Sequence, residues 1–268
     1  MTTAILGVGV MGETILTGLL AAGTDPASLR ITTRRAKHQA RLRAKYPAVE
    51  VTGNTAAAGW ADTVLVVVKP QDVADVLTEI GPALRPGALV VSLAAGVETA
   101  TLERHLPAGH PVVRVMPNTP AAVGEGMAAI SAGAHADDAH LERVAQILSA
   151  VGQVVVVPEK YQDAITAIAG SGPAYVMFVV EAMIDAGVML GLPRGTATEL
   201  VIQTVFGSAK LLRDSGQHPT VLRENVTSPG GTTAAALREF ESHRVKAAFM
   251  DAMEAACRRS QELGRSQP

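Results

Sequence analysis

The first 157 residues alternate short apolar runs with longer amphipathic stretches, and this alternation limits the folds open to the chain. Short runs rich in Val and Ile between helical stretches are typical of a parallel sheet covered by helices on both faces. The pattern therefore predicts an α/β domain with a doubly wound parallel sheet. The expected strands are 4–6, 29–33, a short third strand before Asn54, 64–68, 88–93, 112–116, an edge strand at 126–130 and a last strand at 153–157. The expected helices are 12–22, 36–45, 72–80, 98–106 and 137–151.

A second, all-helical part follows from Pro158, where the strand pattern ends. At 268 residues the chain is near the size at which a second core forms, so we place two domains at 1–158 and 159–268. Residues 174–190 are apolar nearly all round and predict a buried core helix. The last helix carries an apolar stripe from Val245 to Ala256 at helical spacing. Stripes of this length in a small helical domain predict burial against a second copy of the chain.

Charge and cysteine content exclude several kinds of protein. The chain has 23 Lys and Arg against 25 Asp and Glu, a net charge of −2, so it lacks the basic field that binds nucleic acids or anionic membranes. Its one cysteine, Cys257, cannot form an intrachain disulfide, which favours a reducing compartment. No Lys or Arg precedes Arg30, and no uncharged apolar run reaches ~18 residues. We therefore expect a cytoplasmic protein without nucleic-acid or membrane partners.

A glycine loop, Gly7-Val8-Gly9-Val10-Met11-Gly12, follows the first expected strand and opens the first expected helix. Gly7 would permit a tight turn, Gly9 would let the backbone approach a pyrophosphate, and Gly12 would let the helix pack on the strand. The helix N-terminus would attract the anion. An isolated GxG turn occurs in many loops, but the strand, the helix and the position near the N-terminus together predict a Rossmann-type dinucleotide site.

The turn after the second expected strand bears on the choice of cofactor. A site for NAD places an Asp or Glu about 20 residues after the glycine loop, where its carboxylate bonds the ribose 2′-hydroxyl. This chain has Arg34 and Arg35 in that turn, and guanidinium groups match the geometry of a phosphate. The alternative is a solvated basic turn without a ligand. The sequence therefore favours NADPH as cofactor, with NADH as the other candidate.

The carboxyl ends of the strands in an open parallel sheet line its ligand crevice. Lys69 and Pro70 follow the fourth strand, Ala94 and Ala95 follow the fifth, and Asn54 follows the short third strand. Proline keeps the backbone out of a helix where a cofactor would lie, and the alanines leave room for a nicotinamide ring. Proline and glycine also simply end strands, so each of these loops has a purely structural alternative.

The helical part holds one segment suited to an anion, between residues 225 and 233. Ser228 is expected as a helix N-cap and Pro229 as the first helical residue, while Gly230 and Gly231 would leave the first amides uncovered. Such a helix start binds a carboxylate or a phosphate. The alternative is a well-capped helix that binds no ligand.

Other polar and small residues give weaker signals. A turn at 170–175 is expected to enter the buried helix with Ser171 as its cap, for ligand contact or for tight helix packing. Glu159 stands at the domain junction, as a helix-start acid or with a functional role. Cys257 is expected as a small packing residue. The seven histidines form no helical metal pair with a nearby acid, so we predict no metal site.

Six motifs, in the right order over the whole chain, resemble the pyrroline-5-carboxylate reductase family. They are the glycine loop, Val68-Lys69-Pro70-Gln71, and residues 92–96, 114–120, 170–175 and 226–233. The resemblance implies reduction of 1-pyrroline-5-carboxylate to L-proline with NADPH or NADH, the last step of proline biosynthesis. It also implies a Rossmann domain followed by a helical dimerisation domain, a homodimer, and further assembly such as a decamer.

The resemblance implies roles for individual residues as well. From the chemistry of this substrate and of the helix start, we expect the backbone amides of 228–232 to hold the substrate carboxylate and the Thr233 hydroxyl to hydrogen-bond the ring nitrogen as the catalytic group. The chain departs from the family at Ala169, where Ser is common, and at Thr33-Arg34-Arg35, where Asn-Arg-Ser is common. The substrate residues are Glu159, Ser228, Gly231, Thr232 and Thr233. The cofactor residues, with those from the strand ends, are Leu6, Gly7, Val8, Gly9, Val10, Met11, Arg34, Arg35, Asn54, Val68, Lys69, Pro70, Ala94, Ala95 and Asn225.

Two other functions fit parts of the pattern. A β-hydroxyacid dehydrogenase has a similar two-domain plan but needs a catalytic lysine, and Lys160, Lys210 and Lys246 lie in no supporting motif. A non-catalytic nucleotide-binding sensor would also keep the fold. Oxidation of NADPH with pyrroline-5-carboxylate or with small 3-oxo acids distinguishes the three functions.

Overall fold

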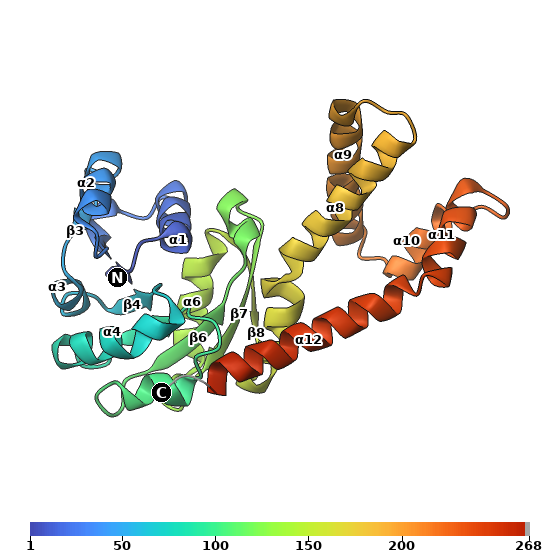
Figure 1. Ribbon diagram of the computed structural model, residues 1–268. Helices are drawn as coiled ribbons and strands as arrows, with labels where there is room; N and C mark the ends of the chain where they lie inside the picture. The colour runs from blue at the N-terminus through green and yellow to red at the C-terminus, as the bar shows by residue number, and fades with distance from the viewer. Residues whose placement is uncertain (266–268) are drawn as a thin grey trace. The chain divides into compact units, whose positions relative to one another are not determined.

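The computed structural model describes residues 1–265, and its first part is built on one eight-stranded sheet (Figure 1). The strand order is β3-β2-β1-β4-β5-β6-β7-β8. The strands are β1 Thr3–Leu6, β2 Leu29–Thr32, β3 Glu50–Val51, β4 Thr63–Val66, β5 Leu89–Ser92, β6 Val112–Met116, β7 Gly126–Ala132 and β8 Gly152–Val156. The first six pair in parallel. This pairing confirms the parallel sheet predicted from the apolar runs.

β7 differs from expectation in its position, whereas β8 is the last strand as expected. β7 pairs antiparallel with β6, with Ser131 opposite Arg114, and parallel with β8. The sheet therefore ends at β8, and the expectation of an edge strand at 126–130 is wrong. Residues 128–131 are buried, and Ala128 and Ile130 belong to the apolar cluster that includes the buried side chains of α6 (Asp138–Ser149).

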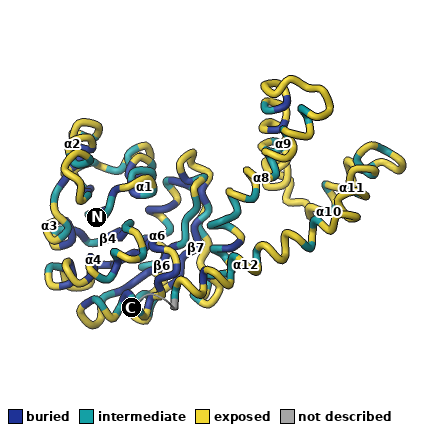
Figure 2. The backbone as a smooth tube through the Cα atoms, viewed as in Figure 1, coloured by how far each residue is buried: buried dark blue, intermediate teal, exposed yellow. Residues whose placement is uncertain are grey.

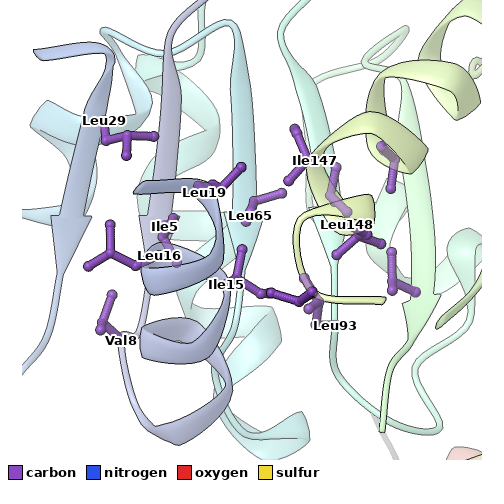
Figure 3. Packing of buried hydrophobic residues seen from close by; sticks show 14 of the residues in the cluster. Ile5, Val8, Ile15, Leu16, Leu19, Leu29, Leu65, Leu93, Ile147 and Leu148 are labelled. Atoms are coloured by element: carbon purple, nitrogen blue, oxygen red, sulfur yellow. The ribbon is translucent and has the colours of Figure 1, made fainter. Parts of the chain in front are cut away.

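Helices cover both faces of the sheet. On one face α1 (Val10–Ala21) and α6 (Asp138–Ser149) pack, and Ile15 and Leu16 of α1 meet Ile5 and Leu65 of the sheet (Figure 3). α2 (Ala36–Lys45) adds Leu42 to the same cluster. On the other face α3 (Asn54–Ala58), α4 (Val73–Ile80) and α5 (Thr99–Arg104) form the second cluster. Each fully buried Ile or Leu side chain contributes roughly 1.5–3 kcal/mol to the stability of the fold. The two clusters therefore hold the strands, and the loops at their ends, in fixed positions.

Helices alone follow β8 in the described chain. They are α7 Gln162–Ile165, a π-helical segment Thr166–Gly170, α8 Gly172–Met189, α9 Arg194–Ser215, α10 Pro219–Asn225, α11 Thr232–Ser242 and α12 Val245–Arg265. Two compact units result, the first with residues 1–171 and the chain from Ala255 onward, the second with Gly172–Glu254. The first unit therefore includes the end of α12 and extends beyond the expected boundary at residue 158.

The helices of the second unit are mostly exposed in the single chain (Figure 2). α8 is apolar, yet none of its residues is buried, and Met177 and Phe178 are 65% and 73% exposed. The helix forms where it was expected, but the expectation that it is a buried core helix is wrong for a single chain. The apolar sequence of α8 predicts that this helix is covered, but it does not tell whether the same chain or another molecule covers it.

The small-residue segment at 170–175 is not a turn. The backbone is helical throughout Glu159–Met189, and Ser171 keeps helical angles (φ −86°, ψ −19°) instead of capping a new helix. The Ser171 amide donates to the Thr166 carbonyl at 2.8 Å, which closes a π-helical turn. Within residues 1–265, Glu159–Met189 is the one helix long and apolar enough to cross a bilayer by length and composition. The core helix of a soluble protein passes the same test.

Candidate active site

The glycine loop lies at the carboxyl end of β1, next to the ends of β2 and β4. Gly7 has φ +84°, a left-handed conformation that favours glycine. A Cβ at Gly7 would lie 2.5 Å from the Val68 side chain and 3.0 Å from the Val67 carbonyl oxygen. The amides of Gly7 and Val8 donate to the Thr32 carbonyl at 3.2 and 2.8 Å, which joins the loop to β2. Both the backbone and the packing therefore require glycine at this position.

The other two glycines leave room for different neighbours. A Cβ on Gly12 would lie 3.3 Å from the Gly7 carbonyl oxygen and 3.5 Å from Ile5, so Gly12 allows α1 to pack closely on β1. A Cβ on Gly9 would be 4.0 Å from its nearest neighbour, so this side of the loop is open to a ligand. The first amides of α1 have no partner within the helix, and the positive end of the helix dipole lies there. The loop therefore fits the pyrophosphate of a dinucleotide.

The predicted cofactor residues differ in what they expose. Leu6 and Val8 are 0% and 1% exposed and belong to the core, so only their backbone can face a ligand. Ala94 is also a core residue, whereas the next residue, Ala95, is exposed. Val10 is 87% exposed at the start of α1. Leu6, Val8 and Ala94 therefore have no side chain that a cofactor can reach, whereas Val10 and Ala95 do.

The loops after β4 and β5 lie at the same sheet edge as the glycine loop. Lys69 is exposed in the loop after β4, and Pro70 starts a short 3₁₀ turn, Pro70–Asp72. Gly96 turns the loop after β5 with φ +76°. Because β1 and β4 are neighbours whose helices cover opposite faces, this edge is the switch point where open parallel sheets bind ligands.

The residues after β2 and β3 are engaged with carboxylates. The two terminal nitrogens of Arg34, Nη1 and Nη2, donate to Asp72 Oδ1 and Oδ2 at 3.2 and 2.8 Å. Asn54 donates to Glu79 Oε2 at 2.9 Å and accepts from a β2 hydroxyl at 2.6 Å. Arg35 is exposed, and its backbone is the N-cap of α2. Sequence reasoning found the arginines and Asn54 but missed both acids, because a pair across two segments leaves no local signal.

A buried arginine on β6 organises the region around the end of β8. The Arg114 side chain is 5% exposed, and its Nη1 donates to Glu159 Oε1 at 3.2 Å. Glu159 also accepts from the Thr99 amide at 2.8 Å and the Thr99 hydroxyl at 2.6 Å. Asp163 lies 4.0 Å from Arg114 Nη2 and accepts from the Ser260 hydroxyl at 2.7 Å. The Glu159 carboxylate therefore caps α5, which is a different helix from the one it was expected to start.

Sequence reasoning quoted Arg114 within a motif but gave it no role. A charged residue inside the apolar run Val-Val-Arg-Val-Met is a usable signal, because a buried charge in a native protein is paired. The partner could not be found in the same way, since Glu159 lies 45 residues later.

The loop before α11 in the second unit differs from its expected structure. α11 begins at Thr232 with Gly231 as its N-cap, so Ser228 and Pro229 are not the cap and the first helical residue. The Gly231 amide donates to the Ser228 carbonyl at 3.0 Å, and Gly230 has φ +70°. A Cβ on Gly231 would lie 2.5 Å from Ser228 Oγ. The left-handed φ favours glycine at 230, and the close approach of Ser228 leaves little room for a side chain at 231, so the two glycines do not need a ligand as their explanation.

The uncovered amides of this loop therefore belong to residues 232–234, the first turn of α11. The positive end of the dipole of this 11-residue helix lies at the same place. Thr233 is half-buried and Thr232 is exposed. Asn225 is exposed at the end of α10. A small carboxylate would find several amide donors and two threonine hydroxyls at this helix start.

Other groups with chemical potential have different surroundings. Among residues 1–265, no three His, Cys, Asp or Glu side chains come together as a metal site requires. Lys210 and Lys246 form ion pairs with Asp214 and Glu241. The Lys160 ammonium lies 5.0 Å from the centre of a tyrosine ring. These contacts give none of the three lysines the setting of a catalytic base.

Known proteins match both parts of the chain. Residues 159–263 match the family described as pyrroline-5-carboxylate reductase dimerisation. Residues 2–96 match the family described as NADP oxidoreductase, coenzyme F420-dependent. A pyrroline-5-carboxylate reductase of Corynebacterium melassecola is 44% identical over 267 residues, which cover 98% of this chain and 99% of that protein.

Solved structures agree with these sequence matches. The pyrroline-5-carboxylate reductase of Coxiella burnetii superposes with a TM-score of 0.93 at 37% identity, covering 98% of both chains. The enzyme of Plasmodium falciparum, solved with NADP bound, gives a TM-score of 0.86 at 32% identity, again over 98% of both chains. The likeness thus extends over nearly the whole chain and confirms the resemblance carried by the six motifs. This protein therefore belongs to the pyrroline-5-carboxylate reductase family, the NAD(P)H-dependent oxidoreductases of the last step of proline biosynthesis.

Proposed function

We propose that this protein reduces 1-pyrroline-5-carboxylate to L-proline with NADPH, and that it also accepts NADH. The observation that carries the proposal is the open glycine loop at the β1–β4 switch point of a chain 44% identical to a known reductase over nearly its full length. The reduced nicotinamide supplies the hydride, and a cyclic imine is basic enough to react as its iminium. The protein is therefore required to orient two reactants and to bind charge rather than to supply a strong acid.

The cofactor residues of the proposal are mostly those of the first unit. The backbone from Leu6 to Met11 would hold the pyrophosphate, since Gly9 leaves the approach open. Arg34 and Arg35 would meet the 2′-phosphate, with Asn54 near the ribose. The remaining proposed cofactor contacts are Val68, Lys69, Pro70, Ala94, Ala95 and, from the second unit, Asn225.

The substrate residues of the proposal are mostly those of the α11 start. The carboxylate would accept hydrogen bonds from the first amides of α11, with Ser228, Gly231 and Thr232 around it. The Thr233 hydroxyl would hydrogen-bond the ring nitrogen, which fixes the imine carbon for hydride transfer. Glu159 remains a proposed substrate-site residue, and its carboxylate is held by Thr99 and Arg114.

Assembly, domain roles and location complete the proposal. We assign residues 1–158 to cofactor binding and 159–268 to substrate binding and dimerisation. The match of 159–263 to a dimerisation family and the exposed apolar side chains of α8 support a homodimer, with higher assembly such as a decamer. We propose a cytoplasmic location without membrane or nucleic-acid partners, so the apolar surface of α8 is assigned to the second subunit.

Replacement of Thr233 tests the catalytic assignment. Thr233→Ala should lower kcat/KM for pyrroline-5-carboxylate by about tenfold to a thousandfold, because a hydrogen bond to the reacting group is lost, while the Kd for NADPH stays unchanged. Ser242→Ala is the matched control, since its hydroxyl donates to the Arg238 carbonyl at the far end of the same helix. An unaltered kcat/KM in Thr233→Ala would remove this residue from the mechanism.

A further inference from the structure

Arg34 and Asp72 form a two-pronged ion pair at the carboxyl edge of the sheet. Both terminal nitrogens of the guanidinium donate to the carboxylate, Nη1 to Oδ1 at 3.2 Å and Nη2 to Oδ2 at 2.8 Å. The Arg34 side chain is 76% exposed and that of Asp72 is 22% exposed. The acid is therefore the fixed partner of this pair, and the arginine is the partner that a ligand can reach.

The position of Asp72 is set by the loop that follows β4. Its amide donates to the Lys69 carbonyl at 2.9 Å within the 3₁₀ turn Pro70–Asp72. Val73 begins α4 directly afterwards and is 2% exposed in the core. Because its backbone is anchored on both sides, Asp72 stays beside the Arg34 site when the arginine changes partner.

The pair occupies the edge of the guanidinium that a phosphate would use. Carboxylate and phosphate oxygens match the same fork of two N–H groups, so Asp72 and a phosphate monoester are alternative ligands for it. An exposed pair of this kind is weak, so a phosphate dianion can displace the carboxylate. The displaced acid then remains near the phosphate as a like charge, which lowers the affinity for the phosphate.

We propose that Asp72 competes with the cofactor 2′-phosphate for Arg34. Asp72 is thereby a specificity-determining residue: it lowers the affinity for NADPH but not that for NADH, and so reduces the preference for NADPH. The inference rests on the proposed role of Arg34 in the cofactor site. The chemical group concerned is the 2′-phosphate of an adenosine nucleotide. NADH carries a 2′-hydroxyl there, so its affinity does not depend on the release of Arg34 from Asp72.

Binding of nucleotide fragments to the full chain tests this inference without turnover. The probes are 2′,5′-ADP, which carries the 2′-phosphate, and 5′-ADP, which lacks it, and the readout is Kd from titration calorimetry. Asp72→Asn should tighten 2′,5′-ADP about three- to tenfold, the range expected for one exposed charge pair, and leave 5′-ADP unchanged. Asp75→Asn is the matched control, because it removes the same charge from an exposed position on α4 and should change neither Kd.

Two further variants separate failure of this inference from failure of the cofactor site. Arg34→Ala should weaken 2′,5′-ADP and spare 5′-ADP; if it binds both like the parent protein, the proposed 2′-phosphate site itself is wrong. If Arg34→Ala weakens 2′,5′-ADP while Asp72→Asn leaves it unchanged or weaker, competition by Asp72 is wrong and the site stands. In the double variant the gain from Asp72→Asn should shrink to the part that comes from direct repulsion between the carboxylate and the phosphate, and a gain of the same size without Arg34 would overturn competition.

Discussion

Glu159 and Arg114 illustrate how a single charged pair can fix several segments of the first unit. The Arg114 side chain is 5% exposed and donates to the Glu159 carboxylate, which also accepts hydrogen bonds from Thr99, the first residue of α5. Negative charge at a helix start stabilises the helix. One carboxylate thus ties β6, α5 and the start of the helix at Glu159 together.

Glu159→Gln should therefore lower the free energy of unfolding by about 1–3 kcal/mol, because Arg114 keeps its burial but loses a charged partner. Denaturant unfolding measures this change. The matched control is Glu98→Gln, since among the described residues the N-cap Glu98 makes no side-chain hydrogen bond to α5. If Glu159→Gln unfolds with the same free energy as the parent protein but has a higher KM for the substrate, Glu159 contacts the substrate directly instead.

At the residue scale, the sequence predicts positions whose chemistry is local. The glycine loop could be predicted because a left-handed turn between a strand and a helix has its own residue pattern, and Gly7 adopts it with φ +84°. The acids Asp72 and Glu159 could not be paired with Arg34 and Arg114, since those contacts depend on how distant segments meet. Ser228 was wrongly predicted as the N-cap of α11. Its local signal was misleading, because a residue type that often caps helices also occurs in the turn before a helix.

At the scale of elements, one acid joins α1 to α2. Glu13 in the first turn of α1 accepts from Arg41, from Lys45 at 2.9 Å and from the Tyr46 hydroxyl at 3.1 Å. The hydrogen bonds from Arg41, followed by those from Lys45 and Tyr46, lower the pKa of Glu13 from its usual 4.5 to about 2. The contact fixes α2, and with it the turn that carries Arg34, against the helix that follows the glycine loop.

The lowered pKa of Glu13 predicts a pH dependence of stability. The folded state binds the proton less tightly than the unfolded state, so this stabilisation is present above pH ~5 and is lost as the pH falls towards 2. Glu13→Gln should lower the free energy of unfolding by about 1–2 kcal/mol at pH 7; the range is kept small because the Arg41 and Lys45 side chains are partly exposed to solvent. The variant should also lose less stability than the parent protein as the pH falls. Thermal unfolding from pH 7 to 3 checks this, with Glu142→Gln on the exposed side of α6 as control. An acid decline as steep as that of the parent protein would contradict the role given to Glu13.

The elements themselves follow from the sequence more closely than their environments do. β6 lies at the expected residues, Val112–Met116, and α2 at Ala36–Lys45. β6 is an apolar run interrupted only by Arg114, whereas α2 is a polar stretch in which Leu42 is the one buried residue. The turn expected at 170–175, where glycine and serine lower helix propensity, overlaps the end of the π-helical segment Thr166–Gly170, for which the sequence made no prediction. Asn118 donates to the Ala169 carbonyl at 3.2 Å, a contact from a distant loop that supports this segment and has no local signal.

At the scale of the whole molecule, the four phenylalanines indicate that a second chain covers the helical part. All four phenylalanines lie beyond residue 170, and Phe178, Phe206, Phe240 and Phe249 are 73%, 59%, 57% and 38% exposed. Large exposed apolar surfaces of this kind mark contact sites between subunits. The sequence predicted that these helices pack against a second copy, and the dimerisation family matches the same residues.

The protein is therefore expected to sediment at about twice the 27.7 kDa of the chain or at a multiple of that mass. Phe178→Glu should shift the mass towards the monomer, because a carboxylate would then be buried in the subunit contact. Val123→Glu changes a residue that is 78% exposed in the first unit and should leave the mass unchanged. A parent protein that stays at the monomer mass at micromolar concentration would contradict the assigned role of the helical part.

The central claim concerns the reaction, and its most direct test is oxidation of NADPH by the full-length protein with 1-pyrroline-5-carboxylate, followed by identification of the product. The account predicts substrate-dependent oxidation of NADPH with one L-proline formed per NADPH consumed, slower turnover with NADH, and none with small 3-oxo acids. Binding of NADPH without turnover of pyrroline-5-carboxylate, or turnover of a 3-oxo acid in its place, would contradict it.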